Sequence, residues 1–277
     1  RPTRSWCPTC AEPAPAVLNE LRLSDHGLEL IEPDPYLFAP LPDGRGLVLS
    51  RDPAASAASI AQFSERDSRS YVEFCSEVAR ITAFLGPALE SSPPAIEQLS
   101  RADLWPLVRM GRRFRRLGRK DAYRLLRWAP MSAADFVSDW FESEPLRAVI
   151  AAPGIFGTAL GPRSAGSTAV LLMQMATGDG MPRLVRGGLG ALTSALAAAA
   201  RTAGVDVRTD ADVGRIDVLN GRVAGVTLKT GEQLRAGTVV SNADPRRTLL
   251  GLLDPVDLEP GFLLRVRSYR CVGNVAK

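Results

Sequence analysis

The chain has 277 residues, of which 45% are hydrophobic and 6% aromatic, with 24 glycines and 21 prolines. This length and apolar fraction fit one large or two modest globular domains and exclude a disordered chain. No run of about 18 apolar residues predicts a membrane span, and the first ten residues lack the apolar stretch of a signal peptide. Four cysteines are too few for a disulfide scaffold, so we expect a cytoplasmic protein in which Cys75 and Cys271 are ordinary reduced residues.

Between residues 28 and 150 the sequence predicts strands first and helices after them. Residues 28–50 alternate short apolar runs with Pro, Asp and Gly, and Pro42–Asp43–Gly44 is typical of a hairpin turn. A helical stripe of apolar residues continues to about Leu89, after a turn predicted at Arg66–Asp67. Ser91–Pro94 ends it, and further helical patches predict a mainly helical lobe up to Ile150.

Positive charge is concentrated in this lobe. The whole chain has a net charge of +4, but residues 101–128 contain ten basic residues and two acidic ones, so that this segment carries +8. Apolar residues interleave with the charges and predict an amphipathic surface helix over Arg109–Arg127. We interpret it first as a solvated face. Contact with an anionic membrane surface and, less favoured, binding of nucleic acid remain alternatives.

The last third predicts a helix followed by a β-meander. Residues 189–203 favour a helix with Gly204 as its C-terminal cap, followed by a strand at 205–208. Strands are predicted at 212–219, 222–229 and 233–241. The first two are joined by Asn220–Gly221, the strongest short hairpin signal.

Two cysteines and one histidine suggest chemistry that the rest of the sequence does not complete. Cys7 and Cys10 have the spacing of a redox or half-zinc motif, but no second pair accompanies them, and we interpret them as a chance pair near the terminus. His26, the single histidine, lies in a predicted turn. The sequence therefore predicts no metal site, and no side chain can be named as a catalytic acid or base.

Residues 188–193 partly match a dinucleotide-binding fingerprint. Gly188 and Gly190 follow a short apolar run and open a helix, and Asp210 lies 20 residues beyond Gly190. Thr193 occupies the place of the third glycine, where its side chain would hinder close packing. We do not expect this segment to form a nucleotide site by itself.

Taken together, these motifs resemble those of the phytoene desaturase-like FAD-dependent oxidoreductases. The resemblance covers roughly residue 16 to the end, and its most specific parts are the order of helix, strand and meander and the two segments Arg186–Leu192 and Ser241–Pro245. It implies an α/β (mixed α+β) fold: a partial FAD/NAD(P)-binding domain with a β-meander and an inserted helical substrate domain. The strand and G-x-G-x-x-G turn with which such proteins begin, and their Gly-rich C-terminal segment, are not found in this sequence.

The resemblance also implies a domain division and site residues. Residues 1–55 would be a partial N-terminal region, 56–185 the helical substrate domain, 186–250 the returning FAD domain, and 251–277 the start of a C-terminal substrate sheet. FAD would be contacted by the backbone of Val213, by Asn242, Ala243 and Asp244 at the end of the last meander strand, and by the backbone at Gly187 and Gly188.

Two main hypotheses of function follow, beside a third in which Gly188 and Gly190 alone would serve a nucleotide-dependent enzyme. The first is an FAD-dependent dehydrogenase or desaturase that acts on an apolar or amphipathic substrate, here as an incomplete chain that alone binds FAD poorly. The second is a non-catalytic protein that binds a membrane or a partner through the basic helical lobe.

Overall fold

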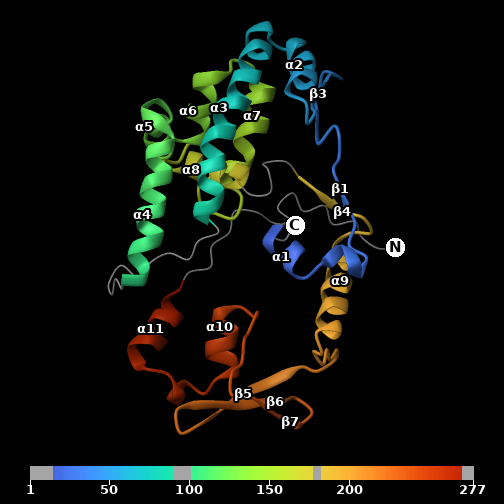
Figure 1. Cartoon of the computed structure of the whole chain (residues 1–277), viewed down its shortest axis with the longest axis vertical. Helices are drawn as coiled ribbons and strands as arrows, with labels where there is room; N and C mark the ends of the chain where they lie inside the picture. The colour runs from blue at the N-terminus through green and yellow to red at the C-terminus, as the bar shows by residue number, and fades with distance from the viewer. Residues whose placement is uncertain (1–14, 90–100, 177–181, 270–277) are drawn as a thin grey trace. The chain divides into compact units, whose positions relative to one another are not determined.

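The structure, a computed structural model, describes residues 15–89, 101–176 and 182–269 (Figure 1). These residues form two compact units, unit 1 up to Ala199 and unit 2 from Ala200 onward. Both combine helices with small antiparallel sheets, which confirms the mixed helix-and-sheet class. In the described part of the chain, no helix is both long and apolar enough to cross a bilayer.

Unit 1 begins with a helical turn and a β-hairpin. Its first elements are α1 (Pro15–Glu20), the 3-10 turn η1 (Leu23–His26), β1 (Leu30–Ile31), β2 (Leu37–Pro40) and β3 (Gly46–Leu49). The predicted turn joins β2 to β3, with Gly44 at φ +83° and the Asp43 carboxylate accepting a hydrogen bond from the Arg45 N–H. β1 instead pairs with a distant strand, β4 (Leu184–Val185), in a separate two-stranded sheet.

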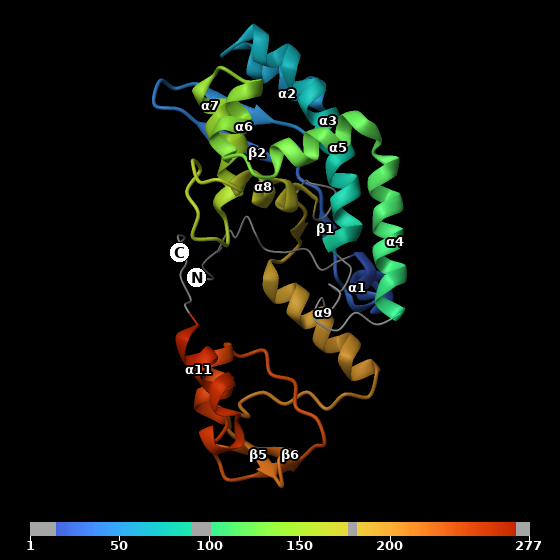
Figure 2. The ribbon, with the colours of Figure 1, turned by 90° about the vertical axis from the view of Figure 1, so that its left-hand side faces the viewer.

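A helical lobe makes up most of unit 1 (Figure 2). Its helices are α2 (Pro53–Ala61), α3 (Glu65–Leu89), α4 (Arg101–Arg116), α5 (Gly118–Trp128), α6 (Ala133–Trp140), α7 (Glu144–Ala151), η3 (Ala152–Ile155) and α8 (Ser167–Ala176). Residues 56–89 and 101–150 contain no strand, as the sequence predicts. The lobe packs around buried aromatic rings, with Phe74 contacting Phe136, Trp140 and Phe141 at centroid distances of 5.0–6.0 Å. Burying each such ring contributes about 1.5–3 kcal/mol.

The start of α3 differs from the prediction. The turn expected at Arg66–Asp67 lies earlier, because the Ser64 hydroxyl accepts the Asp67 N–H at 3.1 Å and caps the helix. Glu65 and Asp67 then fall in its first turn, where acidic side chains complement the helix dipole. The two residues that suggested a turn are therefore helix-start residues.

The basic segment forms two helices instead of one. α4 ends at Arg116 and α5 begins at Gly118. Gly118 has a φ of +76°, a left-handed conformation that favours glycine and breaks the helix there. The prediction of a single basic helix over Arg109–Arg127 is therefore wrong in this respect.

The helix predicted over residues 189–203 is α9 (Leu189–Thr202), but the strand expected at 205–208 is not formed. The Gly204 and Val205 N–H groups donate to the carbonyls of Arg201 and Ala200, and Gly204 has a φ of +83°. This is the helix-ending arrangement predicted for Gly204. Residues 205–208 are not a strand, since no described strand pairs with them.

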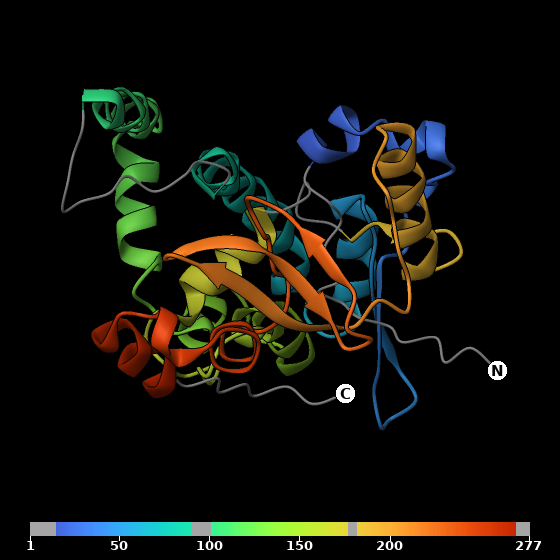
Figure 3. The same ribbon diagram turned by 90° about the horizontal axis from the view of Figure 1, so that it is seen from below.

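Unit 2 contains the predicted meander, seen from below in Figure 3. Its strands are β5 (Val213–Leu219), β6 (Arg222–Leu228) and β7 (Gln233–Arg235), all antiparallel. Asn220 and Gly221 both have positive φ, as the favoured two-residue hairpin turn requires. The register shifts between Val213 and Arg215, so a bulge at Gly214 interrupts the alternation of side chains between Val213 and Ile216.

The end of unit 2 departs from the sequence expectations. β7 stops at Arg235, whereas the sequence predicts a strand to residue 241, because the apolar run around Val240 finds no described strand to pair with and Val240 is 92% exposed. After it come α10 (Pro245–Arg247), η5 (Thr248–Leu252), η6 (Pro255–Asp257) and α11 (Pro260–Ser268). The family resemblance predicts a sheet segment from residue 251, but Pro260 opens a helix, whose first N–H groups the Glu259 carboxylate caps.

Candidate functional site

The backbone of Val213 faces away from the meander. β5 is an outer strand of its sheet, and Val213 lies opposite Leu228. The next residue, Lys229, donates its N–H to the Asp212 carbonyl at 2.8 Å. Because backbone groups alternate sides along an antiparallel strand, the N–H and C=O of Val213 point away from β6. They present one donor and one acceptor side by side, as the edge of an adenine requires.

The loop 241–244 is held by hydroxyl groups. The Ser241 and Thr248 hydroxyl oxygens lie 2.8 Å apart, and the Ser241 hydroxyl accepts the Ala243 N–H at 3.2 Å. The Thr248 hydroxyl donates to the Ala243 carbonyl at 3.3 Å. These bonds fix the loop against the start of η5.

A shallow hollow of about 350 Å³ lies between this loop and β5. Its lining is mainly apolar and includes Ile216, Val223, Val239 and Leu249, together with Ala243 of the loop. Of the predicted residues, Ala243 lines the hollow, and Val213 lies on the same strand as the lining residue Ile216, three positions before it.

Asp244 is not placed as the sequence predicts. Its carboxylate accepts the N–H groups of Arg246 and Arg247 at 2.8 and 3.3 Å, which caps α10. The family resemblance implies that Asp244 lies at the end of the last meander strand, facing the cofactor. The Asp-Pro pair instead starts a helical turn, and capping engages the carboxylate.

Gly187 and Gly188 form the turn between β4 and α9 in unit 1. Their φ angles are +85° and +81°, which only glycine adopts without strain. A Cβ at Gly188 would meet nothing within 4 Å, so the backbone there is open to close approach. In the neighbouring turn of α9, the Thr193 hydroxyl donates to the Gly190 carbonyl. These glycines belong to a different unit from Val213 and the loop.

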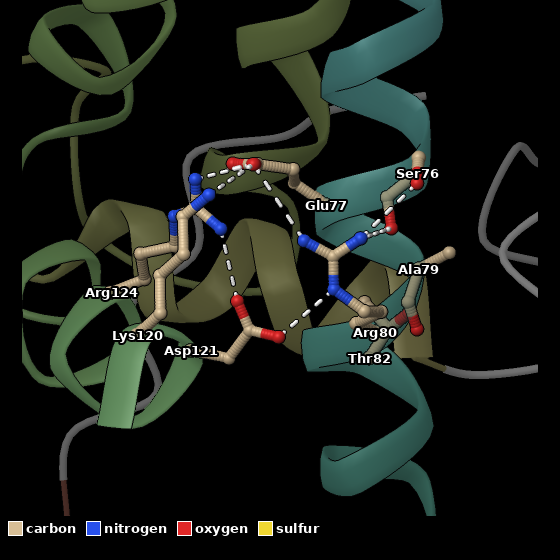
Figure 4. Close-up of polar contacts among 8 residues, drawn as sticks. All are labelled: Ser76, Glu77, Ala79, Arg80, Thr82, Lys120, Asp121 and Arg124. Carbon is tan, nitrogen blue, oxygen red and sulfur yellow. Dashed lines mark hydrogen bonds and ion pairs between the residues drawn. The ribbon is translucent and has the colours of Figure 1, made fainter. Parts of the chain in front are cut away.

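An ion-pair cluster that the sequence pattern did not predict joins α3 and α5 (Figure 4). Asp121 accepts from Arg80 at 2.9 Å and from Arg124 at 3.0 Å. Arg124 also pairs with Glu77, which is only 4% exposed and lies 3.6 and 3.8 Å from Arg80 and Lys120. The hydrogen bond from Arg80, with that from Arg124, holds the pKa of Asp121 below its usual value. The three-residue spacing within each helix was the available signal.

Within the described residues, the remaining histidine, cysteine and acidic side chains form no metal site. His26 ends η1, and Cys7, Cys10 and Cys271 lie outside the described residues. Cys75 is a half-buried free thiol on α3 whose pKa is raised by burial, which makes it less reactive.

Comparison with known proteins decides the family. The model of the flavin containing amine oxidoreductases matches residues 5–276. The chain belongs to this family. It is 33% identical to the rat protein named pyridine nucleotide-disulfide oxidoreductase domain-containing protein 2, over 95% of this chain and 48% of that protein.

Two bacterial relatives support the resemblance to phytoene desaturases. The hydroxyneurosporene desaturase of Cereibacter sphaeroides is 30% identical over 88% of this chain and 47% of its own length. The phytoene desaturase (neurosporene-forming) of the same organism is 29% identical over 83% of this chain and 40% of its own length. The chain thus spans about half the length of the curated relatives it matches.

A flavin-containing family implies FAD, and some but not all of the predicted residues fit this cofactor. The outward donor and acceptor of Val213 fit the adenine of FAD, and the open backbone at Gly188 fits close approach by a cofactor. The Asp244 carboxylate does not fit, because it is engaged by α10. The groups of this chain that fit FAD are therefore mainly backbone groups.

Proposed function

We propose that this chain supplies part of the FAD site and the substrate lobe of an FAD-dependent oxidoreductase of the dehydrogenase or desaturase type. The observation that carries the proposal is the outward backbone of Val213 at the edge of the meander, in a chain that belongs to a flavin-containing family. FAD, when bound, would accept the hydride or electrons that the substrate loses. The residues of the chain would bind FAD and the substrate and orient them toward each other.

The predicted residues other than Asp244 each have a binding role in this proposal. Val213 hydrogen-bonds the adenine edge through its N–H and C=O. Asn242 and Ala243 approach the cofactor through the loop that Ser241 and Thr248 hold in place. Gly187 and Gly188 permit close passage of the cofactor because they carry no side chain.

The proposed substrate is apolar or amphipathic. Two relatives are desaturases named for phytoene and hydroxyneurosporene, both largely hydrocarbon molecules.

Titration of the chain with FAD, monitored through the amide signals in NMR spectra, tests the proposal. Since a single neutral hydrogen bond contributes only about 1 kcal/mol, we expect the 277-residue chain to purify colourless and to bind FAD only well above micromolar concentrations. At millimolar FAD, the shifted amides should be those of Val213 and residues 241–244. If FAD shifts none of these amides, the proposed site is wrong.

A pair of variants isolates the Val213 backbone. Val213→Pro removes the outward N–H at the first residue of an edge strand, where proline is tolerated. It should weaken FAD binding about fivefold, the equivalent of one hydrogen bond. Val213→Ala keeps the N–H and should bind FAD as the parent chain does. Equal binding by all three proteins would refute the contact.

A further inference from the structure

α4 has an exposed face on which apolar and basic side chains lie together. Residues of this face recur at steps of three and four, so that they follow one side of the helix. The α4 face consists of Leu104, Trp105, Val108, Arg109, Arg112 and Arg116, all exposed. Leu104 is 51% exposed, Trp105 64% and Val108 45%. Isolated exposed apolar residues are ordinary, but three within five positions on one helix face form a patch.

The opposite side of α4 packs against unit 1. Phe114 is half-buried and meets Phe84 of α3 edge to face, with ring centroids 6.0 Å apart. Met110 and Leu117 are also half-buried. In Figure 2, α4 runs beside α3 and leads into α5. The packed side fixes the rotation of the helix, which makes the α4 face an outward one.

The charge around the α4 face is of one sign. From Leu104 to Lys120 the sequence contains seven basic residues and no acidic residue. The guanidinium of Arg112 lies 5.8 Å from the centre of the Trp105 ring, so an amphipathic ring and a cation are paired on the surface. The apolar residues gather toward the N-terminal half of the helix and the arginines toward its C-terminal half.

We propose that the α4 face docks onto an anionic lipid surface. Leu104, Trp105 and Val108 would enter the boundary between headgroups and acyl chains, and the arginines would bind lipid phosphates. Tryptophan and arginine are suited to this interface, because each has an apolar body and a polar end. Nucleic acid would satisfy the arginines but leave the apolar residues in water, so it fits the face less well. The proposal is independent of the flavin function.

Vesicle co-sedimentation of the 277-residue chain tests the docking. We expect binding to vesicles of phosphatidylcholine with 30% phosphatidylserine, and little binding to phosphatidylcholine alone. Binding should weaken strongly between 0.1 and 1 M salt, as the Debye length falls from about 10 to about 3 Å. Absence of binding to the anionic vesicles at low salt would overturn the proposal.

A charge variant and a matched control assign the binding to the α4 face. The variant replaces Arg109, Arg112 and Arg116 with Gln, and should bind anionic vesicles about a hundredfold more weakly. The control replaces three exposed arginines elsewhere, Arg69, Arg201 and Arg222, and loses the same charge. It should bind nearly as the parent does. Equal losses in both variants would mean general charge attraction and would overturn the assignment.

Tryptophan fluorescence tests insertion separately from adsorption. The sequence has four tryptophans, of which Trp105 is exposed, Trp128 buried and Trp140 half-buried, while Trp6 lies outside the described residues. Insertion at α4 predicts a blue shift on anionic vesicles that comes from Trp105. Trp105→Phe should keep the apolar contact and lose the blue shift. A shift that persists in this variant would contradict insertion at α4. Binding of a single-stranded oligonucleotide without binding of anionic vesicles would overturn the lipid proposal in favour of nucleic acid.

Discussion

Asp121 is an acid within the most basic stretch of the chain, and its contacts explain why it is there. Arg80 and Arg124 both donate to its carboxylate, which lowers its pKa from the usual value of 3.8. A carboxyl whose pKa is lower in the folded protein stabilises the fold above its unfolded pKa, and that contribution disappears as the pH falls through the folded pKa. Asp121 therefore stabilises the junction of α3 and α5 at neutral pH.

Asp121→Asn should make this contribution visible. We expect the variant to have a lower free energy of unfolding than the parent at pH 7, and the difference to shrink as the pH falls below about 4. Urea unfolding at several pH values measures it. A difference that stays constant down to pH 3 would show that the carboxylate charge is not what stabilises the junction.

Strands and turns show which elements a sequence can predict. The Asn220–Gly221 turn and the Gly204 helix end were predictable, because each depends on the conformation of one or two residues. The run at Val239–Val240 was not, since a strand requires a neighbour. The Arg80–Asp121 contact joins residues 41 apart, and local spacing does not show which distant helices meet.

At the candidate site the same limit applies. The outward backbone of Val213 follows from strand pairing, which the hairpin signal made predictable. The capping role of Asp244 depends on α10, whose position replaces the expected strand end. Residues of β5 and of η5 line the same hollow, and no sequence pattern predicts that these two elements meet.

Gly225 lies where β6 and β7 of the meander approach each other closely. A Cβ at this position would lie 2.1 Å from the Leu234 carbonyl oxygen of the neighbouring β7. We expect Gly225→Ala to separate β6 from β7 and to lower the free energy of unfolding of unit 2 by about 3 kcal/mol. At Gly237 a Cβ would meet nothing within 4 Å, so Gly237→Ala is the matched control and should change that free energy by less than about 1 kcal/mol. Chemical denaturation monitored by strand amides distinguishes the two.

The chain as a whole divides into two compact units, each with its own buried residues. In unit 1, the fully buried carboxylate of Asp67 accepts the backbone N–H groups of Glu142 and Ser143 at 2.9 and 2.8 Å. This contact ties α3 to the start of α7. Because stability is distributed in cooperative units, a defect in one unit should not propagate to the other.

Asp67→Ala should therefore lower the stability of unit 1 alone. The variant leaves two backbone N–H groups without their acceptor, which costs roughly 3 kcal/mol. Hydrogen exchange should accelerate in the amides of α3, α6 and α7, while those of β5 and β6 keep their protection. Gly225→Ala should give the reverse pattern, so each variant controls for the other. Faster exchange in both units of either variant would mean that the chain unfolds as one cooperative body, with its stability shared across the two units.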